Sequence, residues 1–191
     1  GDGIFDDKEG GVIYDQSDTS FVGKEVNLIT NANFDDGGSA SVDGSSRSST
    51  IPNWTISSST NSSHSSVELE VNNNNQLVIR SESAGSTSYG IAVQQLNTPL
   101  VANTLYKFTF DLISASHLTF NKIRIGTMLN TFGAGSGRHS ISQGAKFLSS
   151  GVDKEFVFVP TANDTHIAIG GQDDVTEIIV DNILLEDQSG I

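Results

Sequence analysis

The chain contains no cysteine, so neither a disulfide nor a cysteine-ligated zinc ion can stabilise it. Cationic residues are also scarce: ten Lys and Arg stand against 23 Asp and Glu, for a net charge of −13. A surface this acidic repels the phosphates of nucleic acids, and we expect no nucleic-acid partner. Apolar runs all fall short of the roughly 18 residues that a membrane span needs, so we expect no membrane insertion.

Sequence patterns of catalytic sites are lacking as well. The histidines have neither the i, i+4 spacing of a helical metal site nor an HExxH context, and there is no Gly-x-Ser-x-Gly motif. The glycine-rich residues 133–137 do not lead into a helical pattern, as a phosphate-binding loop does. We therefore expect no enzyme. The alternative is glycoside cleavage by two facing carboxylates, for which the candidates are Asp35, Asp36, Asp111, Asp173, Asp174, Glu177 and Asp181.

Short segments of alternating polar and apolar residues fill most of the chain. Residues 67–71 and 77–80 alternate on either side of the turn-forming run Asn72-Asn73-Asn74-Asn75, which predicts a β-hairpin. Further strands are expected at residues 90–96, 105–112, 120–129, 155–160, 167–169 and 178–185. Strands this closely spaced cannot be parallel βαβ units, which need long crossovers. The sequence predicts an all-β fold, an antiparallel β-sandwich.

Two regions differ from this pattern. Residues 1–26 are rich in turn-forming and charged residues, and we interpret them as an N-terminal arm or linker from a larger protein. Residues 39–66 are rich in serine, and we expect loops there on both sides of a strand around Trp54 and Ile56. Residues 27–191 are then one β-sandwich binding domain.

Both ends of this domain carry recognisable segments. Residues 27–36 read NLITNANFDD and residues 177–185 read EIIVDNILL; between them lie GIAVQQ at 90–95 and NTLYKFTF at 103–110. In this order and spacing they resemble the carbohydrate-binding-module superfamily of galactose-binding-like jelly rolls, which includes xylan-, glucan- and laminarin-binding modules. The resemblance implies a jelly roll, a polysaccharide or cell-surface glycan as partner, and an extracellular location.

The resemblance also implies a structural Ca²⁺ where the first and last strands meet. Its ligands would be the carboxylates of Asp35 and Asp181, with backbone carbonyls near Asn33. Calcium takes six to eight oxygen ligands, which suits two carboxylates and neighbouring carbonyls. In the alternative, Asp35 caps a turn and Asp181 accepts hydrogen bonds from local amides.

The position of the sugar ligand follows from the types of side chain that bind sugars. Aromatic rings pack on sugar faces, while amides and arginine bind hydroxyl groups. With one Trp and three Tyr the chain has few such rings, and we expect Trp54, Tyr106, Phe108 and Phe110 in the core. Eight residues on or near strands of the concave sheet are candidate ligand contacts or, alternatively, part of a solvated strand face: Tyr89, Gln94, Asn121, Arg124, Asn130, Phe132, Arg138 and His139.

Together these features predict a non-catalytic carbohydrate-binding or surface-adhesion module, joined to neighbouring domains of a larger chain. The alternative is a virion structural or receptor-binding domain, from a phage tail fibre, a tailspike or a capsid decoration. In that case the fold would serve assembly as a homo-oligomer, such as a trimer.

Overall fold

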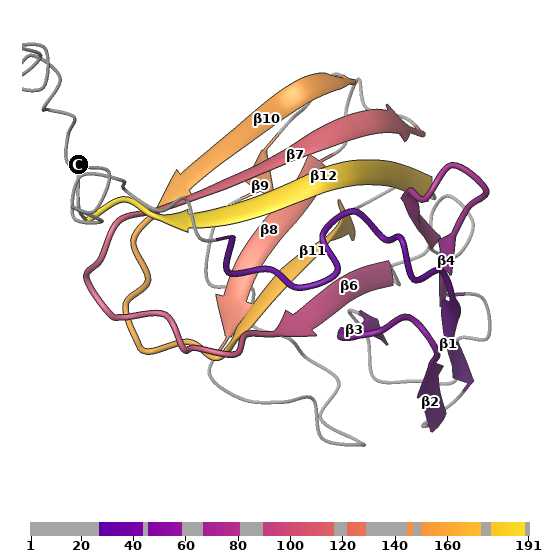
Figure 1. Cartoon of the computed structure of the whole chain (residues 1–191), viewed down its shortest axis with the longest axis horizontal. Coiled ribbons are helices and arrows are strands. Elements are labelled where there is room, and N and C mark those ends of the chain that lie inside the picture. The colour runs from indigo at the N-terminus through magenta and orange to yellow at the C-terminus, as the bar shows by residue number, and fades with distance from the viewer. Residues whose placement is uncertain are drawn as a thin grey trace, which may run out of the picture.

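The computed structural model describes residues 27–43, 46–58, 67–80, 90–116, 122–128, 145–146, 150–172 and 177–189. These residues form two antiparallel sheets that pack into a sandwich of the jelly-roll type, as the sequence predicts (Figure 1). The arm predicted at residues 1–26 lies outside the described residues. No helix in the described ranges is long and apolar enough to span a membrane.

The larger sheet has seven strands in the order β10-β7-β12-β5-β4-β1-β2. Their bounds are β10 (Gly151–Phe158), β7 (Tyr106–Ala115), β12 (Glu177–Asp187), β5 (Leu77–Arg80), β4 (Val67–Val71), β1 (Ser39–Asp43) and β2 (Ser46–Ser49). The predicted hairpin is confirmed, because β4 pairs with β5 through the asparagine turn. In that turn Asn72 Oδ1 accepts hydrogen bonds from the backbone amides of Asn74 and Gln76, and Asn75 adopts a positive φ.

The smaller sheet has five strands in the order β3-β6-β11-β8-β9. Their bounds are β3 (Trp54–Ser58), β6 (Gly90–Gln95), β11 (His166–Gln172), β8 (Lys122–Met128) and β9 (Ala145–Lys146). Trp54 and Ile56 thus belong to a strand, as predicted. The expectation of loops before this strand was wrong, because residues 39–43 and 46–49 form the strands β1 and β2. Serine has a low strand propensity, and these strands form through their pairing with each other and with β4.

The core lies between the sheets and follows the alternation of the strands. In β7, Tyr106, Phe108, Phe110 and Leu112 are buried, whereas the residues between them are partly exposed. Trp54 is 1% exposed and packs 5.7 Å from the ring of Phe34. The four aromatic residues predicted for the core are therefore confirmed there. Burying each such side chain stabilises the fold by about 1.5–3 kcal/mol.

One side of the sandwich is closed by residues 27–38, which we call the N-terminal segment (Figure 1). The segment pairs with the second half of β12: the Leu28 amide donates to Leu185 O at 3.0 Å, and the Ile183 amide donates to Ala32 O at 3.3 Å. It also reaches the smaller sheet, because the Thr30 amide donates to the side chain of Gln94 at 2.8 Å. The N-terminal segment therefore bridges both sheets.

Candidate binding face of the five-stranded sheet

The pairing of β3 with β6 decides which side chains leave the core. Trp54 pairs with Gln94 and Ile56 pairs with Ala92, and all four residues lie on the inner side, where they are buried. Thr55, which lies between Trp54 and Ile56, therefore points to the outer face of the sheet together with its partner Val93. On the neighbouring strand pair, Gln95 and His166 are also partners, two positions further along this face.

A hollow of about 940 Å³ lies beside this part of the sheet. Its floor includes the buried Val93 and His166, and exposed polar residues surround it. The polar lining consists of Ser48, Ser49, Thr50, Asn53, Thr55, Gln95 and Asn97. Every one of these side chains offers a hydroxyl or amide group, and none carries a charge. The described lining can therefore form hydrogen bonds with a hydroxyl-rich ligand.

The wall of the hollow between Thr50 and Trp54 is anchored to the N-terminal segment. The indole Nε1 of Trp54 donates to Asn31 O at 3.2 Å, and Asn31 Nδ2 donates to Pro52 O at 3.2 Å. Asn31 and Phe34 both have positive φ, of 47° and 55°, a conformation that is rare for a bulky residue such as phenylalanine. Such strain persists only where the surrounding packing holds it, and here the burial of Phe34 against Trp54 does so.

Among the described residues that line the hollow, His166 is the titratable one. It is 4% exposed, and its Nδ1 lies 2.7 Å from the hydroxyl oxygen of Thr165. Burial lowers the pKa of His166 below its usual value of 6.5. The imidazole is therefore neutral at pH 7, and it presents a hydrogen-bonding group rather than a charge.

Gln94 was predicted as a ligand contact, and the structure corrects this. Its side chain is fully buried, its Nε2 donates to Thr30 O, and its Oε1 accepts from the Thr30 amide and hydroxyl. The next residue, Gln95, lines the hollow instead. Alternation could not distinguish the two, because residues 91–94 are all buried and both faces of β6 are covered.

The other predicted ligand residues are placed only in part. Arg124 lies in β8, where it pairs with Gly170 of β11. Six others lie outside the described residues, namely Tyr89, Asn121, Asn130, Phe132, Arg138 and His139. Sequence reasoning missed Asn97, His166 and the polar wall at Ser48–Asn53. The serine-rich composition there predicts loops, and only the pairing of β1 with β2 brings this wall to the sheet.

The predicted calcium ligands lie on two adjoining parts of the backbone. The hydrogen bond from the Ile183 amide to Ala32 O joins the segment that carries Asn33 and Asp35 to the strand that carries Asp181. Asp35 Oδ1 accepts a hydrogen bond from Asn75 Nδ2 at 3.1 Å, and Asp181 Oδ1 accepts one from the Asn182 amide at 2.8 Å. In the described part of the chain, no three His, Asp or Glu side chains are grouped as metal ligands.

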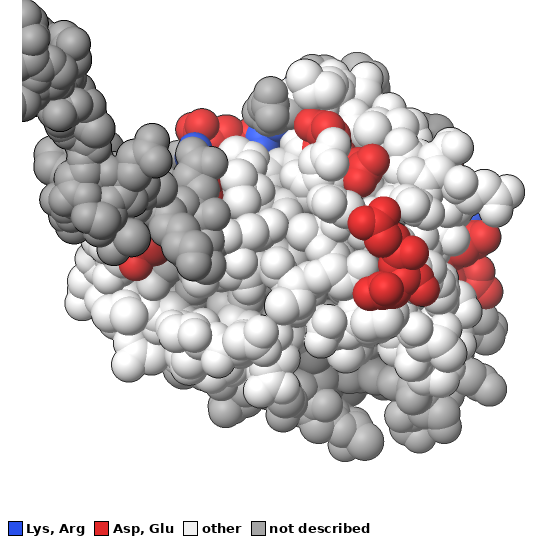
Figure 2. All heavy atoms as spheres, in the orientation of Figure 1, with Lys and Arg blue, Asp and Glu red and all other residues white. Residues whose placement is uncertain are grey.

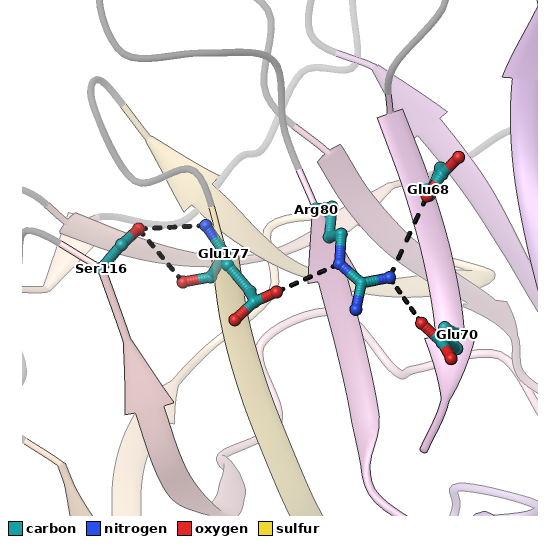
Figure 3. Close-up of polar contacts among 5 residues, drawn as sticks. All are labelled: Glu68, Glu70, Arg80, Ser116 and Glu177. Carbon is teal, nitrogen blue, oxygen red and sulfur yellow. Dashed lines mark hydrogen bonds and ion pairs between the residues drawn. The ribbon is translucent and has the colours of Figure 1, made fainter.

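Glu177, one of the candidate carboxylates for glycoside cleavage, belongs to an ion-pair network on the seven-stranded sheet (Figure 3). Arg80 Nε lies 3.1 Å from Glu177 Oε2, while its Nη1 lies 2.5 Å from Glu70 and 4.0 Å from Glu68. The hydrogen bond to Glu70 is the main cause that raises the pKa of Arg80. The network connects β4, β5 and β12, and because its side chains are exposed it contributes little to stability.

Comparisons with known proteins find similar solved structures. The enzymatically active domain of tailspike protein 4 of bacteriophage CBA120 has a TM-score of 0.51 and 14% identity, over 85% of this chain and 21% of that chain. An arabinose-bound α-L-arabinofuranosidase, MgGH51, has a TM-score of 0.50 and 14% identity, over 84% of this chain and 26% of that chain. A carbohydrate-binding module, BiXyn10A CBM1, has a TM-score of 0.45 and 19% identity, over 63% of this chain and 80% of that chain.

The similarities to the tailspike protein and to the arabinofuranosidase concern the fold alone. The chain spans about a fifth to a quarter of the length of the tailspike protein and the arabinofuranosidase. No protein-family model matches the sequence, and a comparison with curated protein sequences finds no match.

Proposed function

We propose that the protein is a non-catalytic, extracellular carbohydrate-binding module that binds its glycan in the hollow at β3 and β6. The observation that carries the proposal is the lining of this hollow: seven exposed hydroxyl and amide side chains around a volume of about 940 Å³. Ligand sites typically combine such a volume with a few converging polar groups. Trp54 is the aromatic residue of the described lining and is buried, so the described lining residues would recognise the glycan through hydrogen bonds.

Glycan binding is tested with substitutions in the lining. We expect Gln95→Ala and Asn97→Ala to weaken binding by roughly three- to ten-fold each, since each removes a hydrogen bond worth about 0.5–1.5 kcal/mol. Binding is measured by affinity gel electrophoresis over a panel of soluble polysaccharides. The matched control is Asn73→Ala, an exposed asparagine in the turn between β4 and β5, outside the hollow. A wild-type protein that binds no glycan of a broad panel would contradict the proposal.

A structural Ca²⁺ held by Asp35 and Asp181 is part of the proposal. In support, the backbone pairing of Ala32 with Ile183 brings the two segments together, and loop carbonyls there could add oxygen ligands for the cation. A cation that binds only the folded state raises its stability. We therefore expect Ca²⁺ to raise the melting temperature over that in EDTA, and Asp35→Asn or Asp181→Asn to abolish the difference. Asp187→Asn, at the far end of β12, is the control and should keep it. Identical melting with Ca²⁺ and with EDTA would rule the site out.

A role in assembly, as in a virion domain, is the second candidate. The described side chains include six exposed large apolar residues, and all lie on β7, on β10 or in the turns beside them: Val101, Leu105, Ile113, Val152, Val157 and Val159. β10 is an edge strand of its sheet, where another chain could pack. Light scattering distinguishes the two candidates: a stable trimer that binds no glycan favours assembly, and a glycan-binding monomer favours the module.

A further inference from the structure

The cationic residues of this acidic chain are concentrated in one stretch. Residues 112–152 contain no aspartate or glutamate, yet they hold four of the ten Lys and Arg residues, namely Lys122, Arg124, Arg138 and Lys146. The rest of the chain therefore carries a net charge of −17, from 23 Asp and Glu and six Lys and Arg. A stretch of positive charge in such a protein sets up a field that differs from one side of the molecule to the other.

The fold assigns the two signs of charge to different sheets. The five strands β3, β6, β8, β9 and β11 contain no Asp or Glu and three cationic residues, Lys122, Arg124 and Lys146. The seven strands of the other sheet contain ten Asp and Glu and four Lys and Arg. In the view of Figure 2, acidic side chains lie over the part of the surface where Figure 1 places β12 and the N-terminal segment.

The cationic strands and the hollow belong to one sheet. β11 lies between β6 and β8, so the strand that carries Gln95 and the strand that carries Arg124 are about 10 Å apart at the usual strand spacing. In the register, Arg124 pairs with Gly170, and Gly170 pairs with Ile91 of β6. Lys122 pairs with Gln172 in the same ladder. Ile91 is four residues from Gln95, so Arg124 also lies about 13 Å along the strands from the level of Gln95. A ligand that extends from the hollow both across two strands and along the sheet therefore reaches the cationic positions of β8.

From this arrangement we infer that the ligand is an anionic glycan, a chain that carries carboxylate, sulfate or phosphate groups besides its hydroxyls. The inference rests on the proposed function, because the neutral lining of the hollow would bind the hydroxyl groups. Lys122 and Arg124 attract the anionic groups, and arginine in particular binds such groups through paired hydrogen bonds. Lys146 pairs with the core residue Ile123, so its position belongs to the other face of the sheet. The carboxylates of the seven-stranded sheet repel the same ligand, which restricts it to the five-stranded side.

A nucleic acid carries anionic groups too, but the observations favour a glycan. A nucleic acid presents a phosphate at every nucleotide, so its attraction to three or four cations has to overcome a net charge of −13. Single-stranded nucleic acids also bind through exposed aromatic side chains on which their bases stack. The lining of the hollow offers hydroxyl and amide groups instead, and its Trp54 is buried.

Pairs of acidic and neutral polysaccharides test the inference in affinity gels: carboxymethylcellulose beside hydroxyethylcellulose, and polygalacturonate beside dextran. At about 20 mM salt we expect the acidic partner of at least one pair to bind about five-fold more tightly or better, as two ion pairs would provide. At about 300 mM salt the preference should fall several-fold, since screening weakens contacts between exposed charges.

Substitutions that each remove one positive charge then show which residues produce the preference for acidic polysaccharides. Lys122→Gln and Arg124→Gln should each lower the preference for the acidic polysaccharide about two- to five-fold and leave the binding of a neutral one unchanged. Two separate variants keep the test valid if one of them fails to fold, which melting curves report. The matched control is Lys154→Gln, which removes the same charge from β10 of the acidic sheet and should keep the preference.

The outcomes separate this inference from the proposed function. Binding of neutral polysaccharides alone overturns the inference and leaves the proposed function intact, whereas silence with every polysaccharide overturns both. Equal losses in Lys154→Gln and in the two variants would mean that only net charge matters, which contradicts a cationic site on β8. Single-stranded DNA that binds as tightly as polygalacturonate would also contradict the assignment to a glycan.

Discussion

At the residue scale, His166 connects burial to pH dependence. Burial lowers the pKa of His166 in the folded protein, whereas in the unfolded chain the imidazole titrates near its usual value of 6.5. Below about pH 6.5 the unfolded state therefore binds a proton that the folded state does not. The neutral His166 makes its full contribution to the free energy of unfolding above pH 6.5. This contribution is lost as the pH falls towards the pKa of His166 in the folded state.

This predicts a specific difference between the wild type and His166→Gln. The free energy of unfolding of the wild type should exceed that of the variant by less at pH 5.5 than at pH 7.5, because glutamine does not titrate. Urea unfolding at both values measures the difference, and the carboxylates that titrate in both proteins cancel. Parallel pH profiles for the two proteins would show that His166 charges as easily in the folded state as in the unfolded one.

The burial of single residues could be predicted from the sequence where one face of a strand is exposed to solvent. It could not be predicted where both faces of a strand are buried. Tyr106, Phe108 and Phe110 alternate with partly exposed neighbours, so their burial could be predicted. Gln94 and Gln95 are adjacent in a strand whose residues 91–94 are all buried, and their assignment depended on the pairing of β6 with β3. Long-range pairing of this kind has no local signal in the sequence.

At the scale of elements, the N-terminal segment holds the wall of the hollow. Besides the contacts of Asn31 with Pro52 and Trp54, the Val71 amide donates to Gly38 O, and the Thr50 amide donates to Ser39 O. The segment, β1, β4 and the wall that begins near Thr50 therefore share one set of backbone contacts. The hairpin β4–β5 could be predicted from local alternation, whereas β1 and β2 could not, because their serine-rich sequences form strands only in tertiary context.

Two adjacent glycines provide a matched test of this junction. Gly37 has a φ of 63° with nothing within 4 Å of an added Cβ, and Gly37→Ala should cost about 1–2 kcal/mol from backbone strain alone. Gly38 has a φ of 115°, and its Cβ would lie 2.7 Å from Thr50 O. We expect Gly38→Ala to cost more, about 2–4 kcal/mol, because backbone atoms must move. Urea unfolding of the two variants gives the comparison, and equal costs would mean that the contact with Thr50 relaxes freely.

At the scale of the whole molecule, the sandwich separates its charges. Neither the count of 23 acidic residues nor the strand pattern could predict that the ten carboxylates in strands all fall in one sheet. The strands of each sheet are distant in sequence, so their common charge appears only once the strand order is known. Repulsion among like charges on the seven-stranded sheet opposes folding, and the exposed ion pairs of Arg80 offset little of it.

Salt should therefore stabilise this protein. Raising sodium chloride from about 0.02 M to about 0.3 M shortens the Debye length to well under 10 Å, which screens repulsion between carboxylates of neighbouring strands. The ion pairs of Arg80 weaken as well, but they contribute little, so we expect the melting temperature to rise by about 2–4 °C, as a gain near 1 kcal/mol gives for a chain of this length. Arg80→Gln leaves Glu68, Glu70 and Glu177 without their shared cation, and its melting temperature should rise more steeply with salt than that of the wild type. Both are measured in EDTA to exclude cation binding, and a melting temperature that falls with salt would show that attractive pairs outweigh the repulsion.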